Sequence, residues 1–172
     1  MQCQPTFASV SVLVLLSATT VGAQDQTILD AVEAERSPLI ESMRVLVSIY
    51  SVSRDPEGLS SIAEVISCRL RALGGEVELV SHDDPYVMVD TPAEIGQSVV
   101  ARFRGQGRGR VLLLAHMDTV YQRGELADQP FRVDDERAYG LGIADDKHGI
   151  ALILHTLAAL QALAFDDYEL SL

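Results

Sequence analysis

The amino-acid sequence predicts an α/β domain, because apolar patterns with helical spacing alternate with short strand-like runs along residues 25–172. A second observation is the run VLLLA at residues 111–115, whose continuous apolar character is typical of a central strand covered on both faces. Third, His116 follows this run directly, and open α/β sheets bind their ligands at such strand ends. The chain has 172 residues, enough for one ordinary domain with a sizeable core.

The first 23 residues have the layout of a secretory signal peptide. Residues 10–16 form a short apolar core, and residues 21–23 (VGA) form a small-residue cleavage site. The apolar core is too short for a stable membrane span. Because no Lys or Arg precedes it, an N-terminal helix packed within the fold stays open as the alternative. We expect a signal peptide at residues 1–23, one domain at residues 24–172, and an exported protein, periplasmic or secreted.

The composition narrows the class of partner. The formal net charge of −12 argues against a nucleic-acid partner, because phosphate binding needs a basic surface. Twelve of the thirteen basic residues are arginine, and the single lysine is Lys147. After cleavage at residue 23, Cys68 would be the one remaining cysteine, so we expect no internal disulfide.

Residues 25–49 have helical spacing throughout. Ser37 and Pro38 are expected to divide the segment into two helices, because proline disfavours helical conformation in the residue before it. The two helices would share an apolar face made of Ile28, Leu29, Val32, Leu39, Ile40, Met43, Leu46 and Val47.

A turn at residues 51–61 precedes the next helix, which is expected over residues 61–73. Ser60 or Ser61 would cap its start. Ile62, Val65, Ile66 and Leu70 are spaced to face inward, and the pair Gly74-Gly75 predicts the end of the helix.

Strands are expected at residues 76–80, 87–89 and 98–103. We expect residues 97–103 to pair with residues 111–115 through the glycine-rich turn RGQGRGR.

The last third of the sequence adds a polar loop, a helix and the start of a strand. The loop covers residues 121–137, and the helix, apolar nearly all round, is expected at residues 149–164. Residues 168–172 alternate in polarity and open a new strand.

His116 and Asp118 could form a functional pair at the end of the expected strand at residues 111–115. A carboxylate two residues after a histidine can accept the free ring N–H of a metal-bound imidazole, which fixes the tautomer. The pattern H-x-D is a weak motif alone, and a histidine held only by structural hydrogen bonds is the alternative.

The second cluster is GLGIADDKHG, residues 140–149. Its glycines lack the third glycine of a dinucleotide loop, and no acidic residue ends a following strand, which argues against a nucleotide site. Asp145 and Asp146 repel each other unless positive charge lies near, from Lys147, a helix N-terminus or a divalent cation. The alternative is an Asp-rich helix cap, which needs only one of the carboxylates.

The combination of HMDTVY, ADQPFRV, AYGLGIADDKHG and ALILHTL resembles the di-zinc exopeptidase family. That family includes the bacterial folate-hydrolysing glutamate carboxypeptidase, acetylornithine deacetylase and succinyl-diaminopimelate desuccinylase. The resemblance is greatest to the glutamate carboxypeptidase, because the 29-residue interval from His116 to Asp145 and the pattern AYGxGIADDK both match. The likeness covers residues 25–168.

The resemblance implies roles for individual residues. His116 looks like the histidine ligand of one zinc, and Asp145 looks like the carboxylate that bridges two zincs. Asp118 looks like the carboxylate that orients His116. Asp146 and Lys147 match the motif as framing residues, without a catalytic step.

Three further histidines are less informative. His148 stands where glycine is usual in the relatives, so its ring could point to solvent or perturb the site. His82, on a loop, and His155, on a helix, are interpreted as structural.

The implied activity is metal-assisted hydrolysis of an amide bond to a C-terminal amino acid, glutamate in the first place, in a small peptide or acyl-amino-acid substrate. Two zincs would polarise the scissile carbonyl and lower the pKa of a shared water, and a glutamate would act as general base. A deacetylase or a dipeptidase of the same family is the alternative, and a non-catalytic remnant is an alternative from another class.

The family's general base and next zinc ligand are adjacent glutamates, expected 30 to 35 residues after Asp145, beyond Leu172. The remaining ligands and the lid domain used for dimerisation are also expected there. We therefore expect residues 24–172 to be a partial catalytic domain, the N-terminal part of a mixed-sheet zinc-peptidase domain truncated within a strand. It would be inactive by itself and could form a homodimer only with the lid domain.

Overall fold

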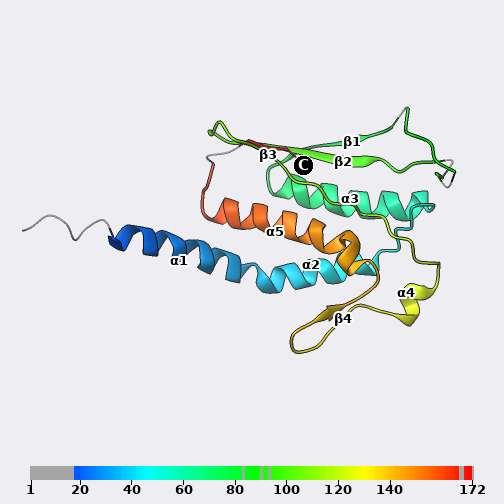
Figure 1. The fold of residues 1–172 in the computed structure, drawn as a ribbon, viewed down its shortest axis with the longest axis horizontal. Coiled ribbons are helices and arrows are strands. Elements are labelled where there is room, and N and C mark those ends of the chain that lie inside the picture. Colours follow the sequence, from blue (N-terminus) through cyan, green and yellow to red (C-terminus); the bar gives the residue numbers. More distant parts are fainter. Residues whose placement is uncertain (1–17, 83, 90, 93, 167–168, 172) are drawn as a thin grey trace, which may run out of the picture.

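The structure, a computed structural model, describes residues 18–82, 84–89, 91–92, 94–166 and 169–171. The apolar run at residues 10–16 lies outside the described residues. A sheet forms one layer, and α3 (Pro56–Ala72) and α5 (His148–Ala162) pack against one of its faces (Figure 1). Helices α1 (Ala18–Ala34) and α2 (Arg36–Ser48) lie on the side of α5 that faces away from the sheet. The layers confirm the expected α/β class.

The division between α1 and α2 falls at Glu35, two residues before the expected site at Ser37 and Pro38. Pro38 instead lies in the first turn of α2, where its missing N–H costs no helical hydrogen bond. Helix α1 passes through residues 21–23, the predicted cleavage site. No helix in the described part of the chain is long and apolar enough to cross a membrane.

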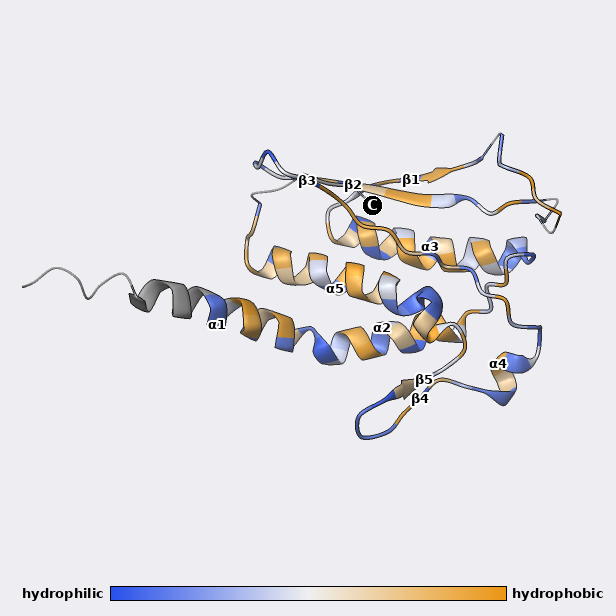
Figure 2. Ribbon diagram, viewed as in Figure 1, coloured by the Kyte–Doolittle hydropathy of each residue, from blue (hydrophilic) through white to orange (hydrophobic). Residues whose placement is uncertain are grey.

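The expected common apolar face of α1 and α2 is only partly buried. Met43, Leu46 and Val47 of α2 are buried, whereas three apolar side chains of α1, in the hydrophobic bands that Figure 2 shows on that helix, are exposed. Those exposed residues are Ile28, Leu29 and Val32.

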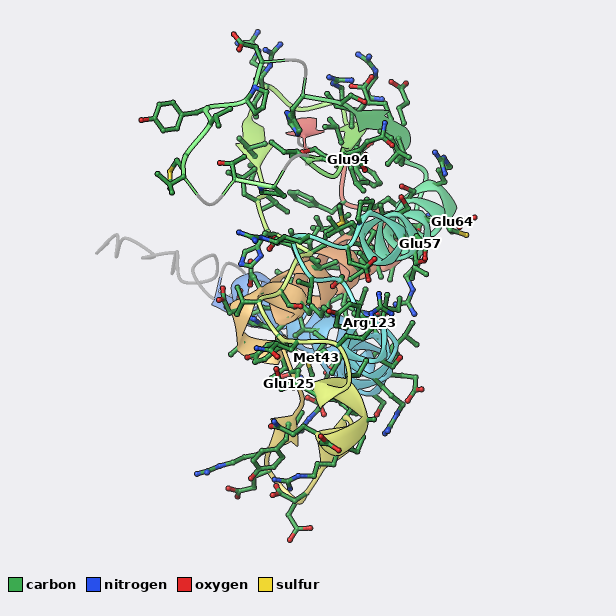
Figure 3. All side chains as sticks on the ribbon, turned by 90° about the vertical axis from the view of Figure 1, so that its right-hand side faces the viewer. Met43, Glu57, Glu64, Glu94, Arg123 and Glu125 are labelled. Atoms are coloured by element: carbon green, nitrogen blue, oxygen red, sulfur yellow. The ribbon has the colours of Figure 1, made fainter. Side chains whose placement is uncertain are left out.

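Helix α3 begins earlier than the sequence predicted. Pro56 takes the first helical position and Asp55 the N-cap position, so neither Ser60 nor Ser61 caps the helix. Proline is favoured at this first position because its fixed φ suits the helix. Figure 3 shows Glu57 and Glu64 on the outer side of α3, and both side chains are exposed.

The inner face of α3 and its end agree with the sequence. Ile62, Ile66 and Leu70 are buried. Gly74 adopts a φ of +88°, its N–H bonds the carbonyl of Arg71, and the helix ends there as expected.

The sheet has the order β1-β2-β6-β3. Strand β2 (Ser98–Arg104) pairs antiparallel with both β1 (Glu76–Val80) and β6 (Glu169–Ser171), and β6 pairs parallel with β3 (Arg110–Leu112). The sheet is therefore mixed, as predicted. The expected hairpin between residues 97–103 and 111–115 is wrong, because β6 lies between β2 and β3.

The expected central strand at residues 111–115 is also wrong in extent and burial. Regular pairing covers only Arg110–Leu112, and Val111, Leu112 and Leu114 are exposed. In the described residues β3 is an edge strand with one neighbour, β6. Residues 87–89 form no strand either. Their side chains are exposed and nothing described pairs with them.

A groove of about 710 Å³ continues the line of β6. Ser171, the last described residue of β6, is paired with Arg102 on one side and Leu112 on the other. The groove walls are the next positions along both neighbours, residues 98–100 and 113–116, and its floor comes from α3 and α5. His116 and Asp118 lie at its far end.

The core sits between the sheet and the helices. Leu46 of α2, Ile62 of α3, Ala101 of β2 and Ala151 of α5 are fully buried in one cluster. Burial of a large apolar side chain contributes about 1.5–3 kcal/mol, so this cluster fixes the helices against β2. The loop after residue 120 contains α4 (Glu125–Asp128) and the small hairpin of β4 (Arg132–Val133) and β5 (Ala138–Tyr139), which project near α2 (Figures 1 and 2).

Candidate metal centre

The structure brings His116, Asp118 and Asp145 together. His116 Nδ1 lies 3.0 Å from Asp118 Oδ1 and 3.2 Å from the Asp118 carbonyl oxygen. On the other side of the ring, Nε2 lies 2.9 Å from Asp145 Oδ1. Because His116 follows β3 and Asp145 precedes α5, the two segments meet at this one imidazole.

The contacts of Nδ1 define what Nε2 can do. Both neighbours of Nδ1 are oxygen acceptors, so a proton on Nδ1 is donated to Asp118. In the neutral ring Nε2 then presents a lone pair toward the Asp145 carboxylate. Two lone pairs at this separation repel each other, and either a proton on Nε2 or a metal ion bound by both atoms would remove that repulsion. The hydrogen bond with Asp145 raises the pKa of His116, with smaller contributions from Asp118 and opposition from partial burial.

A segment that sequence reasoning missed supports Asp118. Residue Val52 forms a parallel bridge with Thr119, and Ser53 donates a hydrogen bond from Oγ to Asp118 Oδ2 at 2.7 Å. Ser51 Oγ donates to the Met117 carbonyl at 2.8 Å. The pattern SVS carried no signal for this contact, because serine is common in turns and Ser53 lies far from Asp118 in sequence.

Asp145 and Asp146 lie in η1 (Ile143–Lys147), a distorted turn before α5. Both residues have non-helical backbone angles, and the peptide bond between them is cis. The Asp145 side chain is 85% exposed and that of Asp146 26% exposed. The two carboxylates therefore occupy different environments, and only Asp145 reaches His116.

Of the three possible sources of positive charge near these carboxylates, the Lys147 amine is directed elsewhere. Its side chain is fully buried, and Nζ donates to the Ile49 carbonyl at 2.7 Å, just beyond α2. Burial lowers the pKa of Lys147 to about 8. Lys147 thus joins η1 to the end of α2.

Gly142 fixes the other end of η1. Its φ is +71°, and a Cβ placed there would lie 2.6 Å from Thr119 Cγ2. Its carbonyl accepts the Lys147 N–H at 3.1 Å. The backbone of the carboxylate turn therefore contacts the residue that follows Asp118.

The remaining histidines lie away from the His116–Asp145 contact. His148 is half-exposed, with Nδ1 at 3.3 Å from Asp146 Oδ1, so it neighbours the second carboxylate. His82 contacts Ser98 Oγ at 2.9 Å. His155, on α5, contacts Ser42 Oγ at 2.6 Å and Glu35 Oε2 at 2.5 Å, which ties α5 to α2 and to the junction before it.

The donor set fits zinc as far as it goes. An imidazole nitrogen and a carboxylate oxygen are ordinary zinc ligands, and a carboxylate on the far ring nitrogen is the usual support of a ligating histidine. Within the described residues, no three His, Cys, Asp or Glu side chains gather closely enough to hold a metal ion. His116 and Asp145 are therefore two candidate ligands, whereas a catalytic zinc site takes three ligands from protein.

Residues 112–170 match the model of peptidase family M20/M25/M40, and this range contains both His116 and Asp145. Carboxypeptidase G2 from Pseudomonas sp. (strain RS-16) is 36% identical over 145 residues, which is 84% of this chain and 33% of that protein. The chain belongs to the M20/M25/M40 peptidase family. Acetylornithine deacetylase from Yersinia pestis is 33% identical over 132 residues, 73% of this chain and 33% of the relative.

The M20 fold itself is present in part. Human carnosine dipeptidase 1 superposes with a TM-score of 0.69 at 21% identity, over 85% of this chain and 33% of that structure. The chain spans about a third of the length of the relatives it matches. The described helices and the mixed sheet are thus the M20 elements that carry His116 and Asp145.

Proposed function

We propose that this chain is part of a zinc-dependent metallopeptidase that hydrolyses the amide bond to a C-terminal amino acid, glutamate in the first place. The observation that carries the proposal is the approach of His116 Nε2 to Asp145 Oδ1 at 2.9 Å, with Asp118 on the opposite ring nitrogen. Membership of a peptidase family and the similarity to a carboxypeptidase support the reaction class.

In this proposal His116 and Asp145 would supply ligands to zinc, and the Asp145 carboxylate could be shared by two zinc ions. Zinc, when bound, polarises the scissile carbonyl and lowers the pKa of a water molecule. Asp118 keeps the His116 ring in the tautomer whose Nε2 can bind the metal. The exposed Asp145 carboxylate faces solvent, so a small peptide or acyl-amino acid can approach it.

Deacylation of an amino acid is the second candidate, favoured by the similarity to acetylornithine deacetylase. Dipeptide hydrolysis is the third, favoured by the fold shared with carnosine dipeptidase. All three reactions cleave an amide bond and use the same two ligands. An N-acyl glutamate, N-acetylornithine and a dipeptide, offered to the protein purified from its natural source, distinguish them by which one is hydrolysed.

The proposal includes export. The apolar run and the VGA site at residues 21–23 support a signal peptide, and a peptidase that scavenges small peptides would work outside the cytoplasm. Mass spectrometry of the protein from its natural source tests this, because export with cleavage predicts an N-terminus at Gln24. An intact N-terminus would contradict it.

Zinc titration of the metal-free chain tests the metal assignment. We expect weak binding in the wild type, because two side chains occupy only half of a tetrahedral shell. Binding should disappear in His116→Ala and in Asp145→Ala and persist in the control Asp128→Ala, an exposed carboxylate on α4. Equal zinc affinity in Asp145→Ala and wild type would contradict the proposal.

A further inference from the structure

We propose that Ser53 is a positioning residue of this metal centre, acting through Asp118 on His116. The inference rests on the proposed zinc site and extends it to a residue outside the ligand motifs. Its basis is a chain of three side chains, from the Ser53 hydroxyl through the Asp118 carboxylate to the His116 ring.

Asp118 uses both of its carboxylate oxygens in this chain. Oδ2 accepts from Ser53 Oγ at 2.7 Å, and Oδ1 accepts from His116 Nδ1 at 3.0 Å. A carboxylate held at one oxygen can rotate about its Cβ–Cγ bond, whereas two partners fix its plane. Because the plane of Asp118 directs the Nδ1–H bond, Ser53 helps to determine where Nε2 points.

The Ser53 hydroxyl has two acceptors within reach. Asp118 Oδ2 lies at 2.7 Å and the Thr119 carbonyl at 3.2 Å. A hydroxyl has one proton, and the charged, nearer acceptor forms the stronger hydrogen bond. The proton therefore goes to Asp118.

The backbone holds Ser53 in place independently of its side chain. Ser53 N–H donates to the Thr119 carbonyl at 3.1 Å, and Thr119 N–H donates to the Ser51 carbonyl at 2.8 Å. Thr119 is buried, so this pairing is shielded from water. Removal of the Ser53 hydroxyl thus leaves the bridge between the two segments intact and changes only the support of Asp118.

Because Asp118 is 41% exposed, loss of the Ser53 hydroxyl should affect the orientation of the Asp118 carboxylate more than the stability of the fold. Water can replace the lost hydroxyl as a hydrogen-bond donor, so the fold should lose little. Water does not impose the same carboxylate plane, so the population of metal-competent His116 rings should fall. A merely structural serine would show the reverse behaviour.

Ser51 provides the matched control. It lies two residues away on the same segment and is fully buried, but its hydroxyl bonds the Met117 carbonyl and not Asp118. Ser51→Ala should lower the urea midpoint of unfolding more than Ser53→Ala does. Its effect on zinc binding should be smaller, because the Asp118 carboxylate keeps both partners.

The experiment measures the zinc dissociation constant of the full chain in wild type, Ser53→Ala, Ser53→Thr and Ser51→Ala, with urea midpoints for each. We expect Ser53→Ala to raise the dissociation constant about tenfold, the lower end of what loss of an outer partner costs a metal site. Ser53→Thr, which keeps the hydroxyl, should remain near wild type. Unchanged affinity in Ser53→Ala, or an equal loss in Ser51→Ala, would overturn the inference.

A second readout needs no metal. Nitrogen NMR of the His116 ring, at a pH where the ring is neutral, reports which nitrogen carries the proton. We expect the Nδ1–H form in wild type and a mixture of both forms in Ser53→Ala. If wild type binds no zinc, the proposed function fails, and the tautomer alone decides the role of Ser53. An unchanged tautomer in Ser53→Ala would then overturn that role.

Discussion

The two halves of the candidate metal centre, His116 with Asp118 and Asp145 with its turn, are held in different ways. On the His116 half, the contacts are hydrogen bonds between side chains, from the Ser53 hydroxyl to Asp118 and from the His116 ring to Asp118. On the Asp145 half, the backbone is anchored instead, by the buried Lys147 amine and by the close contact of Gly142 with Thr119. The Asp145 carboxylate is exposed and, within the described residues, contacts His116.

This difference predicts whether a substitution should lower zinc affinity or stability. Alterations on the His116 half should reduce zinc affinity with little loss of stability, because partly exposed side chains form its contacts. Alterations of the backbone anchors should reduce stability first, because these anchors are buried. Gly142→Ala and Asp118→Asn test this separation, and Gly58→Ala and Leu114→Ser give the largest and smallest stability effects against which to compare them.

Gly58→Ala should have the largest effect. Gly58 lies in the first turn of α3, where an added Cβ would lie 2.1 Å from the Tyr50 carbonyl oxygen. A backbone atom cannot yield as a flexible side chain does, so we expect a loss of about 3 kcal/mol in the free energy of unfolding. Urea denaturation measures it. Gly109→Ala, with nothing near its added Cβ, should stay within about 0.5 kcal/mol of wild type. A similarly small loss at Gly58 would show that the segment after α2 is loosely attached.

Gly142→Ala should cost about 2 kcal/mol, from the positive φ and the approach to Thr119 Cγ2. Thr119→Ser removes that methyl group, so the double variant should recover part of the loss. A double-mutant cycle by urea denaturation should give a coupling energy of about 1 kcal/mol. Strict additivity would mean that the contact does not anchor the Asp145 half.

Asp118→Asn should lower zinc affinity about 10- to 100-fold, because the amide is a poorer partner for the Nδ1–H group. The free energy of unfolding should change by less than about 1 kcal/mol, since the side chain is partly exposed. Zinc titration and urea denaturation of the same samples separate the two quantities. Asp135→Asn, an exposed control in the β4–β5 turn, should alter neither. A large loss of stability with unchanged zinc affinity would show that Asp118 stabilises the fold and does not orient His116.

Leu114→Ser should have the smallest effect, within about 0.5 kcal/mol, because Leu114 is 78% exposed although it lies two residues before His116. Thermal or urea unfolding measures it. A loss above about 1 kcal/mol would show that residues 113–116 are covered in solution, for example by a second copy of the chain.

Local patterns predicted the helices and two strands well. Residues 61–73 have a clear apolar face, and Gly74 ends the helix through a conformation that glycine adopts easily. The position of β6 could not be predicted in this way. The hairpin expectation assumed that neighbours in sequence pair, whereas β6 arrives from some sixty residues further along and separates β2 from β3. The apolar run at residues 111–115 predicts side chains that are buried on both faces of the sheet, but the described residues leave most of them exposed.

Some contacts of the candidate site could be predicted from the sequence and others could not. His116 and Asp118 are two residues apart, so their contact follows from local geometry. The approach of Asp145 to His116 came from the family resemblance, because no local rule joins positions so far apart. The sequence left Lys147 as one possible partner of Asp145 and Asp146, because proximity in sequence does not determine where a long side chain ends, and its amine bonds the Ile49 carbonyl instead. Ser53 was missed because its contact depends on how residues 51–53 pair with Thr119.

The buried amine of Lys147 allows the local separation of η1 from the end of α2 to be measured. Lys147 is the single lysine among 172 residues, and its side chain is 1% exposed. A reagent that modifies amines can reach Nζ only when η1 separates from the end of α2. Its rate at Lys147, followed by mass spectrometry of that peptide, therefore measures the free energy of this local opening.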